Sequence, residues 1–273
     1  MAGQKDALPR MIVTSAFSGI GGIDLGLSAA IPEAEIRYQV EIDPYCRKVL
    51  EKHWPKATRY NDIQTVKPAD IKGTTCIIAG VPCQDTSVAS PTGSGVAGER
   101  SGLWREIKRL IRTVPTVQSL IVENVPGLLS RGLGTILGDI HESGFSYVEW
   151  DCLSSAAIGA CHRRDRVWII ATRDTPKGYD QSDWDRQCRD AAHPMSQGLS
   201  QREGLGRPWA FSAIARGTGW DTEPSVCALD DGLPGRLVNR RAAIKALGNS
   251  VQPQVAYFVG LRLQYLMKEA SDV

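Results

Sequence analysis

Ile77-Ile78-Ala79-Gly80-Val81-Pro82-Cys83-Gln84 is an apolar run that stops at a glycine and then presents a proline, a cysteine and a glutamine. Apolar β-branched residues followed by Gly-Val-Pro predict a buried strand that breaks into a loop at its carboxyl end. In open α/β sheets, ligands bind at that edge. Cys83 is therefore placed for chemistry, although for a lone cysteine a packing role as a small hydrophobe is the better prediction.

The composition is that of an ordinary globular protein. The 273 residues are 42% hydrophobic and 23% charged, and we expect one large domain with a small appendage. No apolar run approaches the ~20 residues of a membrane span, and no apolar signal core precedes Met11. We therefore expect no membrane partner and a location in the cytoplasm.

The cysteines and histidines do not form a metal-binding pattern. The seven cysteines include no Cys-x-x-Cys pair, and an odd number cannot all be paired within one chain. The four histidines show no zinc-ligand spacing with each other or with the cysteines. We expect free thiols in a reducing compartment and no metal.

A glycine-rich turn follows the first predicted strand. The segment from Met11 to Phe17 is predicted to be a strand, and it is followed by Ser18-Gly19-Ile20-Gly21-Gly22. Such a turn between a strand and a helix lets a ligand approach the backbone closely and directs amide N–H groups at it, which favours a nucleotide-like cofactor. The full Gly-x-Gly-x-x-Gly spacing is absent, so a purely structural turn is an equal alternative.

Two acids downstream fit the same cofactor. Glu41 follows the predicted strand Ile36 to Val40, about 20 residues after the glycines, where a carboxylate can hold a ribose diol. Asp62 lies in a turn before the Cys83 strand, where a capping role explains it nearly as well. Glu41 thus supports the cofactor interpretation of the glycine turn.

A second acid-bearing strand end accompanies Cys83. Glu123 follows the apolar run Ser119 to Val122 and precedes Asn124-Val125-Pro126-Gly127, which predicts that Glu123 and Cys83 share one sheet edge. A helix cap is the alternative for Glu123 alone. Between them, the small and polar segment 85–100 predicts a lid, and Leu103 to Val114 has helical spacing.

Arginines precede another predicted strand, Val167 to Ala171. Arg163, Arg164 and Arg166 directly before an apolar strand suit a phosphate or a polar base edge, with a surface cluster as the alternative.

Charge is divided unevenly along the C-terminal third. The region from Asp174 to Gly235 holds six Lys and Arg against ten Asp and Glu, a net charge of −4, whereas residues 236–273 hold six against two, a net charge of +4. The region from Asp174 to Gly235 lacks the alternation of predicted strands and helices, which indicates a small irregular domain. The basic group Arg236, Arg240, Arg241 and Lys245 suits phosphate contacts, with a solvated helix face as the alternative.

Taken together, these stretches resemble the DNA cytosine-5 methyltransferases. Eight segments occur in the order typical of that family, with a variable region before the last. They are Phe17-Ser18-Gly19-Ile20-Gly21-Gly22, Glu41-Ile42-Asp43, Asp62, Pro82-Cys83-Gln84, Gly102-Leu103-Trp104, Glu123-Asn124-Val125, His162-Arg163-Arg164-Asp165-Arg166 and Gly248-Asn249-Ser250-Val251. Three departures are His162 in place of the usual Gln, Cys161 where Pro is common, and Thr86 in place of an aromatic residue.

The resemblance implies an α/β fold with the Rossmann-like sheet of S-adenosylmethionine-dependent methyltransferases. Residues 1–173 plus 236–273 would form the catalytic domain, and residues 174–235 a small irregular target-recognition domain. Cys83 would add to carbon 6 of a flipped-out cytosine, Glu123 would act at N3, and Arg166 would help to hold the base. Arg164 would orient the site or meet a phosphate.

The resemblance also assigns binding residues and partners. S-adenosylmethionine would be bound by Phe17, Ser18, Gly19, Ile20, Gly21, Gly22, Glu41, Ile42, Asp62, Ile63, Pro82, Leu103, Asn249, Ser250 and Val251. Double-stranded DNA would be contacted by Gln84, Ser87, Arg100, Arg236, Arg240, Arg241 and Lys245. We expect a monomer in a bacterial or phage-infected cell.

Three other functions are alternatives. An RNA methyltransferase of the same fold would carry a Cys-Phe-Thr signature, which this chain lacks. A non-catalytic DNA-binding or donor-binding module would not need both Cys83 and Glu123. A nicotinamide dehydrogenase would use the glycine turn but would leave the Pro-Cys-Gln and Glu-Asn-Val strand ends unexplained.

Overall fold

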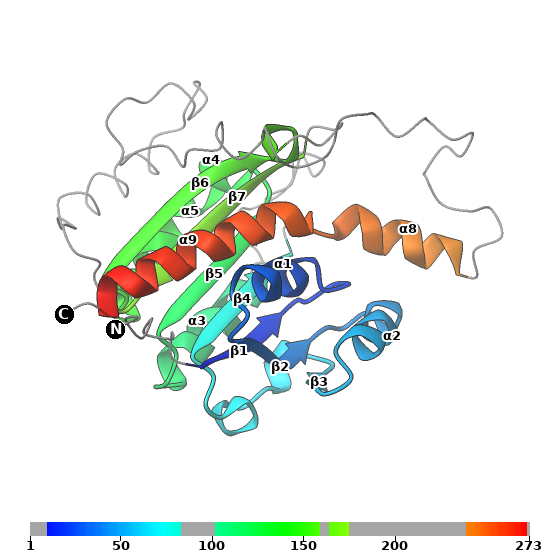
Figure 1. Cartoon of the computed structure of the whole chain (residues 1–273), viewed down its shortest axis with the longest axis horizontal. Helices are drawn as coiled ribbons and strands as arrows, with labels where there is room; N and C mark the ends of the chain where they lie inside the picture. Colours follow the sequence, from blue (N-terminus) through cyan, green and yellow to red (C-terminus); the bar gives the residue numbers. More distant parts are fainter. Residues whose placement is uncertain (1–9, 83–101, 159–163, 175–238, 272–273) are drawn as a thin grey trace, which may run out of the picture.

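The computed structural model describes residues 10–82, 102–158, 164–174 and 239–271. Within these ranges, the strands form one seven-stranded sheet in the order β3-β2-β1-β4-β5-β7-β6 (Figure 1). The strands are β1 (Met11–Ala16), β2 (Ala34–Val40), β3 (Thr58–Tyr60), β4 (Cys76–Gly80), β5 (Ser119–Asn124), β6 (Tyr147–Ser154) and β7 (Asp165–Thr172). The predicted α/β class is confirmed.

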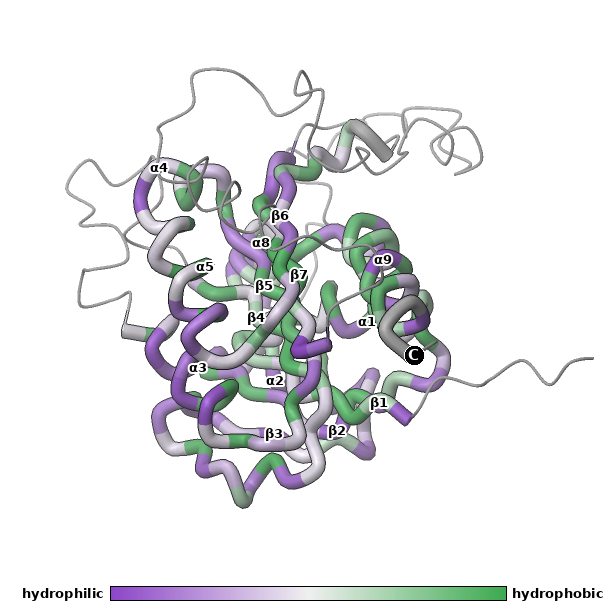
Figure 2. The backbone as a smooth tube through the Cα atoms, turned by 90° about the vertical axis from the view of Figure 1, so that its left-hand side faces the viewer, coloured by the Kyte–Doolittle hydropathy of each residue, from purple (hydrophilic) through white to green (hydrophobic). Residues whose placement is uncertain are grey.

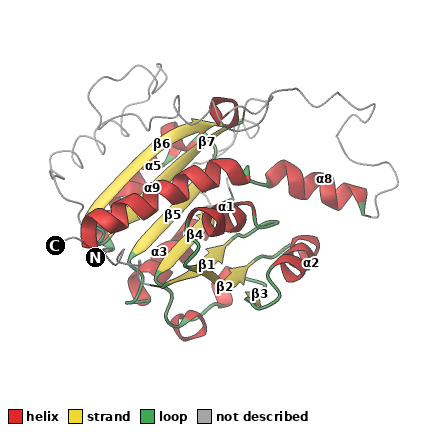
Figure 3. Cartoon of the chain, in the orientation of Figure 1, coloured by secondary structure: helices red, strands yellow, loops and turns green. Residues whose placement is uncertain are grey.

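Helices cover both faces of the sheet (Figure 3). The α-helices are α1 (Gly22–Ala30), α2 (Pro44–His53), α3 (Gly102–Thr113), α4 (Leu128–Arg131), α5 (Leu133–Glu142), α8 (Arg240–Asn249) and α9 (Pro253–Ser271). The 3-10 helices are η1 (Ile63–Thr65), η2 (Pro68–Ile71) and η5 (Ser155–Ile158). Helix α3 agrees with its prediction to within one residue at each end.

The sheet is parallel except at one side. Strands β3, β2, β1, β4 and β5 run parallel to one another, whereas β7 is antiparallel to both β5 and β6. Pairing with β4 and β7 includes Glu123 in β5, and pairing with β7 includes Asn124, two residues that the sequence placed just after the strand. Likewise, β7 begins at Asp165, so Arg166 is part of the strand. The edge strand β3, only three residues long, was not predicted.

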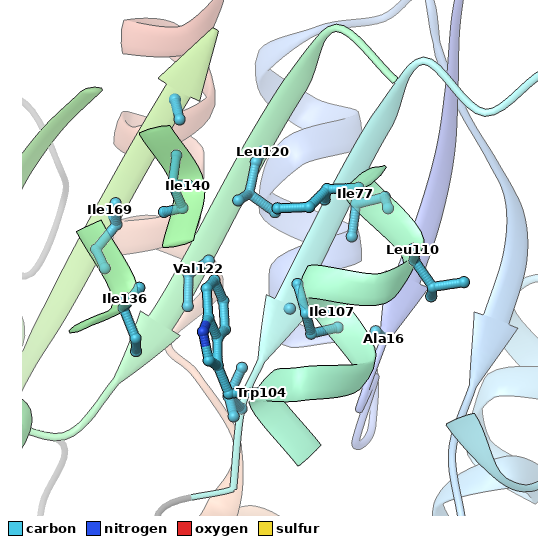
Figure 4. Close-up of a cluster of buried hydrophobic side chains, with 14 of the residues drawn as sticks. Ala16, Ile77, Trp104, Ile107, Leu110, Leu120, Val122, Ile136, Ile140 and Ile169 are labelled. Carbon is cyan, nitrogen blue, oxygen red and sulfur yellow. The ribbon is translucent and has the colours of Figure 1, made fainter. Parts of the chain in front are cut away.

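One hydrophobic core fills the space between the sheet and helices α3 and α5. Trp104 and Ile107 of α3 and Ile136 of α5 pack toward Leu120 and Val122 of β5 (Figure 4). All five side chains are at most 2% exposed. This core holds α3 against the sheet directly beside the carboxyl end of β4.

A second core lies on the other face, under helices α1 and α9. Since the central strands are covered on both faces, they are apolar along most of their length, as Figure 2 shows for β4 and β5. Figure 1 shows α9 crossing the sheet beside α1, with α8 extending beyond it toward α2.

Glycines allow α1 and α9 to approach closely. A Cβ atom on Gly26 would lie 2.4 Å from the backbone oxygen of Pro253, and one on Gly260 would lie 2.7 Å from the Cβ of Ala30. Such distances leave no room for a side chain at either glycine. The C-terminal helix is therefore packed tightly against the first helix of the chain.

Candidate active site

Glu123 and Arg166 form an ion pair at one edge of the sheet. The Nε atom of Arg166 lies 2.8 Å from Oε1 of Glu123. Glu123 is opposite Trp168 in the β5–β7 register, and Arg166 lies two residues before Trp168, on the same face. Because β7 is antiparallel to β5, its first residues lie where β5 ends, and this brings the predicted acid and arginine together.

The Glu123 carboxyl is suited to proton transfer. It is 8% exposed. Burial raises its pKa from the usual 4.5 to about 7, although the positive charges of Arg166 and Arg164 and the hydrogen bond from Arg166 lower it in part. Near neutral pH, a carboxyl with this pKa exists in both protonation states, which is the property of a general acid or base.

Gly80 brings the end of β4 close to both Glu123 and the backbone of Phe17. A Cβ atom on Gly80, the last residue of β4, would lie 3.6 Å from Oε2 of Glu123 and 3.6 Å from the backbone oxygen of Phe17. Val81 and Pro82 follow. Cys83 is the next residue in the chain and lies outside the described residues, so its role as nucleophile stays a prediction.

Asn124 is a site residue that the sequence interpretation did not single out. Its side-chain nitrogen donates to the backbone oxygen of Val81 at 3.5 Å, and its side-chain oxygen accepts from the N–H of Val125 at 2.8 Å. The side chain thus ties the end of β5 to the segment that leads to Cys83. The available signal in the sequence was the Asn directly after Glu123, in the Glu-Asn-Val segment.

A cavity of about 390 Å³ opens at the carboxyl ends of β1 and β2. Its volume lies in the usual range for small-molecule sites. The lining residues are Phe17, Val40, Glu41, Ile42, Asn61, Asp62, Ile63, Gln64, Pro82, Gly102 and Leu103. Seven of these were predicted to bind the cofactor: Phe17, Glu41, Ile42, Asp62, Ile63, Pro82 and Leu103. Its apolar walls and carboxylates fit the adenosine part of S-adenosylmethionine.

Glu41 connects this cavity to the glycine turn. Its Oε2 accepts from the N–H of Gly19 at 2.7 Å, and its Oε1 accepts from the N–H of Asp43 at 2.8 Å. A carboxylate has about four acceptor positions, so two remain for a ligand. Gly19 and Gly21 have positive φ angles of 55° and 85°, which explains why glycine is needed there.

Asp62 fits both of its interpretations. Its side chain caps η1 by accepting from the N–H of Gln64 at 2.9 Å, and the same residue lines the cavity. The other predicted cofactor residues do not line this cavity: Ser18, Gly19, Ile20, Gly21, Gly22, Asn249, Ser250 and Val251. Those of the glycine turn are linked to it through Glu41.

Arg164 contacts backbone carbonyls across the chain. Its Nη2 donates to the oxygens of Gly248 at 2.8 Å and Ser250 at 2.6 Å. Burial, followed by repulsion from Arg166, lowers the pKa of Arg164. These contacts suit the orienting role among the two roles predicted for this residue.

The residues predicted to contact DNA are described only in part. Lys245 lies on α8 and forms an ion pair with Asp43 at 3.1 Å, so a phosphate would have to share or replace that partner. Arg241 is exposed on the same helix, and the backbone of Arg240 belongs to it. Outside the described residues lie Gln84, Ser87, Arg100, His162, Arg163, Arg236 and almost all of the predicted target-recognition region.

No group of three or more His, Cys, Asp or Glu side chains in the described ranges could hold a metal ion. None of the helices described is long and apolar enough to span a membrane.

The chain is similar to curated bacterial enzymes. It is 30% identical to the Type II methyltransferase M2.BsuMI of Bacillus subtilis over 219 residues, which cover 75% of this chain and 55% of that protein. It is 28% identical to the Type II methyltransferase M.NgoBV of Neisseria gonorrhoeae over 171 residues, which cover 57% and 40%. The chain thus spans about half the length of the curated relatives it matches.

Solved structures share the fold. The match to the Schizosaccharomyces pombe Dnmt2 methyltransferase has a TM-score of 0.61 at 16% identity and covers 94% of this chain and 99% of that one. A mutant of Spodoptera frugiperda DNMT2 matches with a TM-score of 0.51 at 22% identity, covering 60% and 50%. Both support the predicted Rossmann-like methyltransferase fold.

A match to a family model agrees with the order of the eight motifs, the Glu123–Arg166 pair and the cavity beside the glycine turn. The family model described as C-5 cytosine-specific DNA methylase matches residues 11–203, more than half of the chain. The chain therefore belongs to the C-5 cytosine-specific DNA methylases.

Proposed function

We propose that this chain transfers a methyl group from S-adenosylmethionine to carbon 5 of cytosine in double-stranded DNA. The observation that carries the proposal is the buried Glu123–Arg166 pair, with a Glu123 pKa of about 7, at the sheet edge where β4 leads to Cys83. The family to which the chain belongs supports it. The site of action would be the cytoplasm of a bacterial or phage-infected cell.

In the proposed reaction, the Cys83 thiolate forms a bond from Sγ to carbon 6 of cytosine. The electron pair of the C5–C6 double bond shifts into the ring, and protonated Glu123 donates a proton or hydrogen bond at N3, which makes carbon 5 nucleophilic. S-adenosylmethionine, when bound, supplies an electrophilic methyl group. Carbon 5 would take that methyl group as the bond between the methyl carbon and the donor sulfur breaks, leaving S-adenosylhomocysteine. Solvent would then accept the proton from carbon 5, N3 would return its proton to Glu123, and the re-formed C5–C6 double bond would expel the Cys83 thiolate.

Neighbouring residues would hold these groups in place. Arg166 already donates to Glu123 and would help to position the base. Asn124 would steady the backbone before Cys83 through its contact with Val81. Glu41 would hold the ribose of the donor, and the apolar residues Phe17, Ile42 and Leu103 would enclose its adenine.

The DNA would have to present its cytosine outside the helix, since carbons 5 and 6 cannot be attacked within the base stack. We assign the closing loop to segment 84–100 and target recognition to residues 174–235. Because that region carries a net charge of −4, phosphate contacts would fall largely to Arg236, Arg240, Arg241 and Lys245.

The test is a methyl-transfer assay with labelled donor and cytosine-rich duplex DNA. The wild-type chain and Cys46→Ala should be active, whereas Cys83→Ala should be inactive. Cys46 is a suitable control because it is buried, and burial together with the charges of Glu41 and Asp43 raises its pKa to about 12, so it is no thiolate at neutral pH.

A second measurement tests the covalent step. DNA with 5-fluorocytosine should trap an adduct at Cys83, because fluorine cannot leave carbon 5 as a proton does. Equal activity of Cys83→Ala and the wild type would refute the mechanism. Methylation of an RNA of the same sequence, but not of the DNA, would refute the substrate.

A further inference from the structure

Arg164 holds the end of α8. The last four carbonyl groups of a helix have no partner within it, so they are satisfied by other groups or by water. Arg164, which directly precedes β7, donates from Nη2 to the oxygen of Gly248, near the C-terminus of α8, and to that of Ser250, just beyond it. A cation at a helix C-terminus is also favoured by the helix dipole. One guanidinium thus ties the junction between α8 and α9 to the catalytic edge of the sheet.

The same junction presses against the glycine turn. A Cβ atom on Gly22 would lie 2.4 Å from the backbone oxygen of Val251, and Val251 is itself buried. Gly22 begins α1, immediately after the turn whose Gly19 N–H binds Glu41. The position of the junction therefore limits the position of the turn.

Helix α8 is also linked, through Asp43, to Glu41 in the wall of the donor cavity. Lys245 pairs with Asp43 at 3.1 Å, and the N–H of Asp43 donates to Oε1 of Glu41 at 2.8 Å. A displacement of α8 would therefore also move Glu41 through Asp43, in addition to the effect through the glycine turn.

We propose that Arg164 is a positioning residue for the donor site, acting through the α8–α9 junction on the glycine turn. Arg164 lies two residues from Arg166, which binds Glu123, so it links the base edge of the site to the donor cavity. This inference rests on the proposed function for the identity of the donor. It predicts that loss of Arg164 weakens donor binding even when no DNA is present.

Arg173 provides a matched control. It follows β7 at the opposite end of that strand, and its guanidinium also binds backbone carbonyls: those of Ile111, Val117 and Ser143, at 2.8, 2.6 and 2.8 Å. Both arginines thus have a structural role, but only Arg164 reaches the α8–α9 junction. A loss of stability alone would not distinguish Arg164→Ala from Arg173→Ala.

The experiment measures the Kd of S-adenosylhomocysteine by calorimetry without DNA, together with Tm. Arg164→Ala should raise this Kd about tenfold or more, as expected for the loss of charge-assisted hydrogen bonds. Arg164→Lys should restore much of the affinity, since an ammonium can donate to the same carbonyls. Arg173→Ala should lower Tm but change Kd less than about twofold. In turnover, the donor KM of Arg164→Lys should rise more than its kcat falls.

Hydrogen exchange of the ligand-free chain gives an independent readout. Peptides spanning residues 247–253 and 17–25 should exchange faster in Arg164→Ala than in Arg164→Lys or Arg173→Ala. Unchanged exchange, equal Kd effects of the two alanine variants, or a wild-type chain that does not bind S-adenosylhomocysteine would overturn the inference. The expected binding and exchange changes in a chain that methylates no DNA would instead refute the proposed function alone.

Discussion

The Glu123 carboxylate accepts a 2.8 Å hydrogen bond from the Arg166 guanidinium, and yet its pKa lies at about 7. Burial of the carboxylate disfavours its charge more than the neighbouring arginines favour it. The balance between burial and the ion pair therefore sets the protonation of a carboxyl group beside Gly80, three residues before Cys83 in the chain.

Glu123→Gln is expected to lower kcat by about 10²- to 10⁴-fold, the range for loss of a general acid. In the wild type, the protonated fraction falls as pH rises through about 7, so kcat should decline above that pH. The variant should lack this decline. Measurement of kcat from low to high pH checks both points.

Glu149→Gln is the control for this prediction, because Glu149 is also paired with an arginine, Arg262 at 2.8 Å, but faces α9. A Glu123→Gln enzyme with normal kcat would contradict the assignment.

Glu41→Gln is expected to weaken binding of S-adenosylhomocysteine about tenfold, because hydrogen bonds to a charged acceptor are stronger than those to a neutral one by about 1 kcal/mol or more. The substitution also weakens the links to Gly19 and Asp43. Calorimetry gives the Kd. Glu35→Gln, in the strand β2 that precedes Glu41 but paired with Arg10 and Arg37, should bind normally. Equal affinities of the two variants would exclude Glu41 from the donor site.

Asp24→Asn is expected to stabilise the protein at neutral pH. Asp24 is fully buried, and burial raises its pKa from 3.8 to about 6, even though Ser15 and Gln39 donate to it. The folded state therefore binds the proton more tightly than the unfolded state does. The resulting contribution to the free energy of unfolding is complete below about pH 4 and is lost as pH rises through about 6. The difference corresponds to about 3 kcal/mol of unfolding free energy.

Urea unfolding of wild type and Asp24→Asn at several pH values checks this prediction. The two proteins should be similarly stable near pH 4, and the variant should gain up to about 3 kcal/mol by pH 7. Glu33→Gln, which removes an exposed carboxylate, should show no comparable gain. A pH-independent difference for Asp24→Asn would mean that Asp24 does not titrate as described.

Gly26→Ala is expected to destabilise the fold by about 2–3 kcal/mol, typical of overpacking. The added methyl group would lie 2.4 Å from the oxygen of Pro253 and 2.5 Å from the Cβ of Ala256, so α9 would have to move. Gly138→Ala in α5 has no atom within 4 Å of the new methyl group, and it should be neutral or stabilising by about 0.5–1 kcal/mol. Thermal unfolding compares them, and equal Tm changes would contradict tight α1–α9 packing.

Much of the site followed from local patterns. Buried strands, a glycine turn with Glu41 about 20 residues later, and strand ends near Pro82 and Glu123 are features of short segments, because side-chain periodicity and backbone preferences act over a few residues. The structure confirms the strands and places Phe17, Glu41 and Asp62 on one cavity. The roles of Cys83 and of the target-recognition region stay predictions.

By itself, the sequence determined that this chain is an α/β protein with a glycine turn after its first strand and an acid at the edge of its sheet. Only the tertiary structure decided that β7 runs antiparallel and delivers Arg166 to Glu123, that burial raises the pKa of that acid to about 7, and that Arg164 holds carbonyls 84 and 86 residues away. The reason is physical: desolvation and long-range pairing depend on what surrounds a side chain in space, and local sequence patterns do not specify those surroundings.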